Sequence, residues 1–170
     1  MHGNILIVDP IVTNRIVLKV KLSSAYYNVT QAASISDALH AVGQSRPDMV
    51  IASAQVTDGT ASDLAHELRT MPKGGDLPMI VIDCKDDQEN RLALLSSGID
   101  AVLGTPLNEA LLLAHVRSLV RSHASDTEWR LQDDTTRALG FAETQAAFLP
   151  TTRAVVVASD KATVLPWMSE

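Results

Sequence analysis

Residues 5–10, ILIVDP, begin the pattern that decides the fold of this 170-residue chain. Four consecutive apolar residues followed by an acid and a proline are typical of a buried strand that ends in a loop. Similar apolar runs recur at 26–32, 48–53, 78–83 and 101–103. Segments in which apolar residues have helical spacing follow them, at 13–24, 36–44, 60–71, 87–97 and 108–122. The first 120 or so residues therefore alternate between strands and helices.

Five strands that alternate with five helices predict an α/β fold, a parallel sheet covered by helices on both faces. Right-handed crossovers leave few possible topologies. In such sheets the loops after the strands carry the function. The residues at these predicted strand ends are Asp9, Pro10, Ser53, Asp83, Thr105 and Pro106.

The helical spacing also predicts which side chains face the core. For each helix in turn we expect the following inward residues: Ile16, Val17, Val20 and Leu22; Ala38, Leu39 and Val42; Leu64, Ala65 and Leu68; Leu92, Leu94 and Leu95; Leu111, Leu112, His115, Val116 and Leu119. Ser36 and Asn108 are expected as N-caps, because their side-chain oxygens can accept from the free N–H groups of a helix start.

Composition argues against several classes of function. The net charge is −6 and the sequence shows no basic patch, so we expect no nucleic-acid partner. No apolar run is long enough to span a bilayer, and residues 1–4, MHGN, do not resemble a signal peptide. The single cysteine, Cys84, cannot form an internal disulfide. We therefore expect a cytoplasmic protein with no membrane partner.

The last third of the chain differs from the rest. Residues 1–122 are expected to form the first domain and 123–152 a polar, helix-permissive linker helix. The run AVVVA at 154–158 predicts one more buried strand, and RAVVVASDKATVLPWMS has the same shape as the first strand and helix start. We interpret 153–170 as the start of a truncated second copy of the first domain, and the chain as a fragment of a longer protein. An extra edge strand is the alternative.

The runs ILIVDP, RPDMVIAS, LPMIVIDC and AVLGTPL resemble the receiver domain of bacterial response regulators, over residues 3 to about 122. The resemblance is closest to the N-terminal receiver of PleD-like diguanylate cyclases, through AYYNV, SSGIDAVLGTPLNEALLLAHVRSL and the partial second copy. It implies a flavodoxin-like (CheY-like) fold with a C-terminal helical extension, and a role in two-component, phosphorelay or cyclic di-GMP signalling. The chain contains no cyclase residues, so we do not expect the chain itself to be an enzyme.

Receiver chemistry needs an aspartate at the end of the third strand as phosphoryl acceptor. Two acids after the first strand help to hold Mg²⁺, a Thr or Ser after the fourth strand bonds the phosphoryl group, and a Lys after the fifth strand pairs with it. Asp9 matches the first acid. The remaining positions depart from the pattern: Pro10 replaces the second acid, Ser53 the acceptor, Asp83 the Thr or Ser, and Thr105 the Lys, with Pro106 following as the family expects.

These departures predict a degenerate phosphorylation pocket. Serine is a poor acceptor without a base, Pro10 cannot ligate a metal, and Asp83 adds negative charge where phosphoryl oxygens would lie. We expect no cofactor and no bound Mg²⁺. Two alternatives stay open: a working receiver with a displaced acceptor, Asp58 or Ser53, and a small-molecule sensor that uses the vacated pocket.

The segments 87–97 and 108–122 carry more apolar residues than one core-facing stripe needs. In receivers this face commonly mediates dimerisation, so the resemblance implies a homodimer or contact with a second receiver of the same parent. The candidate interface residues are Arg91, Leu95, Leu112, His115, Arg117 and Leu119. A full core face is the alternative interpretation of the same pattern.

Overall fold

A computed structural model describes residues 3–72, 74–84 and 88–138 of the chain. The chain divides into two compact units, Met1–Leu131 and Gln132–Glu170, and the fold below is that of the first. Its five-stranded parallel sheet has the order β2-β1-β3-β6-β7. The strands are β1 (Asn4–Val8), β2 (Asn28–Ala32), β3 (Met49–Ser53), β6 (Met79–Cys84) and β7 (Ala101–Gly104). The predicted flavodoxin-like sheet is confirmed.

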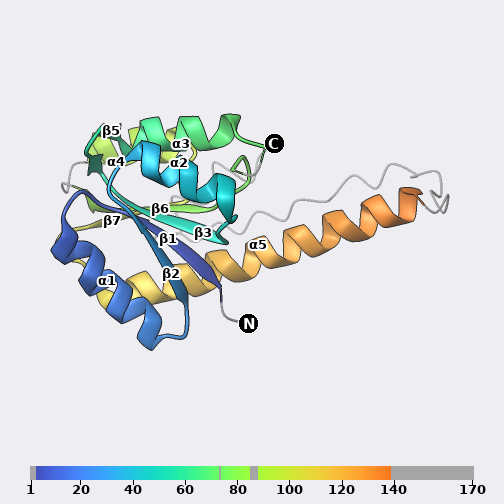
Figure 1. The fold of residues 1–170 in the computed structure, drawn as a ribbon, viewed down its shortest axis with the longest axis horizontal. Coiled ribbons are helices and arrows are strands. Elements are labelled where there is room, and N and C mark those ends of the chain that lie inside the picture. Colours follow the sequence, from blue (N-terminus) through green and yellow to red (C-terminus); the bar gives the residue numbers. More distant parts are fainter. Residues whose placement is uncertain (1–2, 73, 85–87, 139–170) are drawn as a thin grey trace, which may run out of the picture. The chain divides into compact units, whose positions relative to one another are not determined.

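Helices cover both faces of this sheet (Figure 1). They are α1 (Val12–Ser24), α2 (Ile35–Gln44), α3 (Ala61–Thr70), α4 (Gln88–Ser96) and α5 (Glu109–Ala138). One apolar cluster joins the sheet to α2, α3 and Leu94 of α4. The other joins the opposite face to α1 and α5. Because both faces are buried, the side chains of β1 and β3 are apolar except at one end of each strand. The exposed Asn4 begins β1, and the buried Ser53 ends β3.

The expected inward face of α1 is wrong at three of its four positions. Ile16, Val17 and Val20 are 53%, 47% and 60% exposed, whereas Leu18 and Leu22 are buried. The helix carries two apolar stripes, and the core accepts only the one that holds the two leucines. A row of apolar side chains on α1 therefore faces away from the core.

The expectations for α4 and α5 need a similar correction. Leu94 is buried as predicted, but Leu92 and Leu95 are 57% and 43% exposed. On α5, Leu111 is 48% exposed, while Leu112 is buried. The helices α2 and α3 bury Ala38, Val42, Leu64, Ala65 and Leu68, as their spacing predicted.

The helix starts show one correct and one incorrect N-cap prediction. Asn108 accepts from the Leu111 N–H at 3.1 Å, so it caps α5 as expected. The cap of α2 is Ser34 rather than Ser36, because the Ser34 hydroxyl accepts from the Asp37 N–H at 3.1 Å. Thr60 begins α3 with a reciprocal capping box to Asp63.

Two further features of the fold were not predicted from the sequence. A small antiparallel pair, β4 (Gln55–Val56) and β5 (Gly59–Thr60), lies between β3 and α3. Helix α5 runs without a break across the expected boundary between 122 and 123 and is described to Ala138. The expected linker beyond that point and the truncated second copy at 153–170 lie outside the described residues.

Candidate functional site

The carboxyl ends of the central strands bring the candidate residues to one edge of the sheet. Asp9 follows β1, Ser53 ends β3, Asp83 is the next-to-last residue of β6, and Thr105 follows β7. The chain leaves β1 toward β2 on one side and returns to β3 on the other, so this edge contains the topological switch point. The structure therefore brings together the strand ends that the sequence singled out.

Asp9 is 1% exposed and holds the loop before α1. Its Oδ1 accepts from the Ile11 N–H at 2.7 Å, and its Oδ2 accepts from the Asn14 amide at 3.2 Å. The Arg15 guanidinium donates to the Asp9 carbonyl oxygen at 2.6 Å. The N-cap residue of α1, Ile11, has no side-chain cap of its own, so Asp9 satisfies part of this helix start.

Ser53 and Pro10 are the two positions where the receiver pattern would place carboxylates. Ser53 is 6% exposed at the end of β3, and Pro10 is exposed after β1. Neither side chain carries a charge or a carboxylate. The end of β1 therefore supplies one acid, Asp9, where the receiver pattern has two, and the end of β3 supplies a hydroxyl in place of a carboxylate.

Asp83 and Thr105 join the loops after β6 and β7. The Thr105 hydroxyl donates to Asp83 Oδ1 at 2.9 Å. Asp83 has a φ of 58°, which is the left-handed region, next to an irregularity in the pairing of β6 with β7. A direct hydrogen bond thus links the two positions that would contact a phosphoryl group in a receiver.

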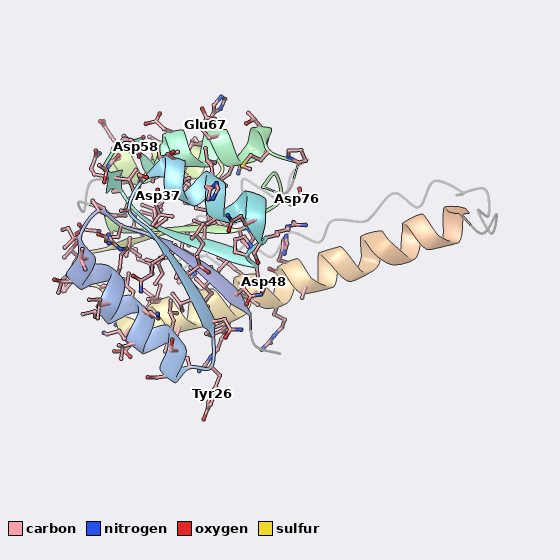
Figure 2. The ribbon with its side chains drawn as sticks, viewed as in Figure 1. Tyr26, Asp37, Asp48, Asp58, Glu67 and Asp76 are labelled. Carbon is pink, nitrogen blue, oxygen red and sulfur yellow. The ribbon has the colours of Figure 1, made fainter. Side chains whose placement is uncertain are left out.

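Asp58, the candidate displaced acceptor, lies beside the start of α2 (Figure 2). Its carboxylate accepts from the Ile35 N–H at 2.6 Å and from the Ser36 N–H at 3.1 Å. The bond from Ile35, reinforced by that from Ser36, lowers the pKa of the Asp58 carboxyl. Asp58 therefore acts as a cap for α2 from another loop.

The expected interface residues divide into exposed, buried and half-buried groups. Arg91, Leu95 and Arg117 are exposed. Leu112 is wrong as an interface residue, because it is 1% exposed and lies in the core. His115 and Leu119 are half-buried on α5, and Leu119 packs against the core cluster.

Sequence reasoning missed three residues that shape this edge. Asn14 and Arg15 fix the Asp9 loop, and Lys21 pairs with Glu109 at 2.8 Å, which ties α1 to the start of α5. The only sequence signal for Asn14 and Arg15 was that two consecutive polar residues follow Asp9 by five and six positions. The Lys21–Glu109 pair joins positions 88 residues apart, and no local pattern predicts it.

The described part of the chain contains no group of three or more His, Cys, Asp or Glu side chains placed to hold a metal ion. Within the same residues no helix combines the length and apolar character needed to cross a membrane.

The five-stranded doubly wound sheet, with its candidate site at the carboxyl edge, defines a flavodoxin-like α/β protein. Residues 5–117 match the model of the response regulator receiver domain family. The chain belongs to this family.

Known relatives agree with this assignment. The response regulator PleD of Caulobacter vibrioides is 29% identical over 149 residues, which cover 88% of this chain and 33% of PleD. The response regulator MprA of a Mycobacterium species is 32% identical over 126 residues, which cover 74% of this chain and 54% of MprA. The chain thus spans a third to about half the length of these relatives.

Solved structures support the same fold. A putative response regulator from Chloroflexus aurantiacus is 25% identical, with a TM-score of 0.67 over 71% of this chain and 99% of that one. The chain is therefore a receiver domain of the response regulators, the proteins of two-component signalling.

Proposed function

We propose that this receiver domain does not take part in ordinary aspartyl phosphorylation and acts by protein–protein contact. The observation that carries the proposal is the hydroxyl of buried Ser53 at the end of β3, where the receiver pattern requires a carboxylate. A serine hydroxyl accepts a phosphoryl group poorly unless a base removes its proton.

The chemistry of the remaining donors supports the same proposal for the metal. Both Asp9 oxygens already accept hydrogen bonds, and Pro10 supplies no ligand. Mg²⁺ requires near-octahedral oxygen coordination, with one or two carboxylates in sites of this type. The residues present therefore fit Mg²⁺ poorly.

The displaced acceptors have little support. Asp58 accepts from two N–H groups at the start of α2, so transfer of a phosphoryl group to this carboxylate would disturb the hydrogen bonds that satisfy that helix start. The Asp83–Thr105 bond supports a second part of the proposal: the loops after β6 and β7 are held together without a phosphoryl group.

The contact surface that we propose lies on α4 and the start of α5. Leu92, Leu95 and Leu111 are large apolar side chains that are 57%, 43% and 48% exposed. Exposed large apolar side chains on two successive helices are the feature that supports an interface here. We propose that this face forms a homodimer or contacts a second receiver of a longer parent protein, with Arg91 at its rim. A diguanylate cyclase activity of that parent is part of the proposal and rests on the similarity to PleD alone.

Solution mass by light scattering tests this surface. The wild-type chain is expected to dimerise, and Leu95→Lys on α4 is expected to shift it to monomer. Val20→Lys is the matched control, because Val20 is an exposed apolar residue on α1, away from α4. A wild-type monomer at all concentrations, or a dimer that only Val20→Lys dissociates, would contradict the proposed surface.

A further inference from the structure

Helix α4 packs on the rest of the domain through very little of its own surface. Leu94 is buried, and the other eight of its nine residues are exposed. The Arg91 guanidinium reaches the Val102 carbonyl oxygen of β7 at 3.5 Å, which is long for a hydrogen bond. Because isolated helices shorter than about 12–15 residues are marginal in water, contacts from other elements must hold α4 in place.

The C-terminal end of α4 is held by a side chain from α3. Arg69, in the last turn of α3, donates from one guanidinium nitrogen to the Ser97 carbonyl oxygen at 3.2 Å. The other terminal nitrogen donates to the Gly98 carbonyl oxygen. Since α3 and α4 pack on the same face of the sheet, this guanidinium joins two helices of one layer (Figure 1).

The charge and shape of the Arg69 side chain suit this position. The last carbonyl groups of a helix lack partners within the helix and carry the negative end of its dipole, so a cation there is stabilising. The last turn of α4 contains no basic residue of its own. A guanidinium presents several N–H groups in a fixed fork and can serve two carbonyl oxygens together, whereas a lysine ammonium is a point charge.

The backbone after α4 is shaped to admit this contact. Gly98 has a φ of 85°, the left-handed conformation in which glycine commonly ends a helix. A Cβ at this position would overlap the Arg69 guanidinium, so glycine also leaves the space that the contact needs. Ile99 follows and is 3% exposed. The guanidinium therefore acts where the chain passes from the exposed helix into the core.

We infer that Arg69 is a positioning residue for the contact surface on α4. It fixes the direction of the helix over the sheet, and with it the exposed side chains of Leu92 and Leu95. Loss of the guanidinium frees the C-terminal end of α4 while Leu94 keeps its place in the core. The inference rests on the proposed function, because it assigns a role in presenting that surface to a second receiver.

Hydrogen exchange in peptides from residues 88–98, read by mass spectrometry, measures how firmly α4 is held. The parent for this measurement is the full-length Leu95→Lys chain, which is expected to be monomeric, so that loss of a dimer cannot itself expose α4. Adding Arg69→Met removes both hydrogen bonds and is expected to speed exchange in α4 about fivefold. Arg69→Lys keeps the positive charge and should give an intermediate rate.

The solution mass of chains that keep Leu95 gives the dimer Kd. Arg69→Met is expected to raise this Kd several fold, because only chains with α4 in place present the surface. Thr60→Ala is the matched control, since it removes the capping box of α3 and lowers the overall stability without touching the end of α4. It should leave both the exchange of α4 and the Kd unchanged, and urea unfolding shows that each variant is folded.

Two results would overturn the inference: an exchange rate of α4 that Arg69→Met does not change, or a dimer Kd that Arg69→Met and Thr60→Ala affect equally. A failure of the proposed function is seen separately, as a wild-type chain that stays monomeric at all concentrations. That result would remove the role of Arg69 in contact, while the exchange measured on the Leu95→Lys chain would still show whether Arg69 holds α4.

Discussion

Replacement of Asp9 tests whether this acid has a structural role, the capping of the loop before α1. Asp9→Ala removes the acceptor of two hydrogen bonds, of 2.7 and 3.2 Å, and leaves the Ile11 N–H and the Asn14 amide without it. Loss of an N-terminal cap costs about 0.5–2 kcal/mol, and an unsatisfied buried donor about 1–3 kcal/mol. We expect Asp9→Ala to lower the free energy of unfolding by about 2 kcal/mol.

Asp9→Asn is expected to cost about half as much, because its carbonyl oxygen can still accept from Ile11. Urea unfolding followed by far-ultraviolet circular dichroism measures both values, with an unchanged m-value as the check that the unfolded state is unaffected. Glu67→Ala, an exposed site on α3, is the control and should stay within about 0.5 kcal/mol of wild type.

The result that would contradict this role is a stabilising effect of the Asp9 substitution. In a pocket that keeps its acids to hold a metal, like charges repel when the metal is absent, so neutralising one acid stabilises the protein. A variant Asp9→Ala that is more stable than wild type would refute the capping role. A wild-type stability that rises with Mg²⁺, with no such rise in the variant, would refute it as well.

Other expected outcomes follow from the same contacts. The pKa of Asp58 is lowered in the fold, so its stabilising contribution is complete above the unfolded pKa near 3.8 and is lost as the pH falls through the folded value. Asp58→Asn should therefore unfold at a lower temperature than wild type at pH 7, and its melting temperature should change less between pH 5 and 2. Thermal melts over this pH range measure both effects. A pH dependence identical to that of wild type would contradict the capping role of Asp58. Gly98 has a φ of 85° and faces the Arg69 guanidinium. Gly98→Ala is expected to cost about 2 kcal/mol in urea, and a neutral effect would show that the turn after α4 is not strained.

The sheet could be predicted from the sequence because buried parallel strands read as continuous apolar runs. The run at 5–8 lies within β1, and that at 101–103 within β7. The same reasoning failed on α1, where the sequence offers two apolar stripes. Only the position of the sheet decides that Leu18 and Leu22 are buried and that Val20 is not.

The site was predictable as a set of positions and not as a set of contacts. Asp9, Ser53 and Asp83 were found because strand ends of a parallel sheet converge at one edge. The engagement of Asp9 by Asn14 depends on the loop conformation. The bond from Thr105 to Asp83 depends on the left-handed backbone of Asp83, which is uncommon outside glycine and has no signal in the local sequence.

The central claim is that this receiver domain takes no phosphoryl group, and intact-protein mass after incubation with Mg²⁺ and acetyl phosphate tests it most directly. Ser53→Ala and Asp58→Asn run beside the wild-type chain, and a receiver known to be phosphorylated serves as the positive control. The account predicts an unchanged mass for all three chains while the control gains one phosphoryl group. A stoichiometric adduct on the wild-type chain, lost in Ser53→Ala or in Asp58→Asn, would contradict the account and identify the acceptor.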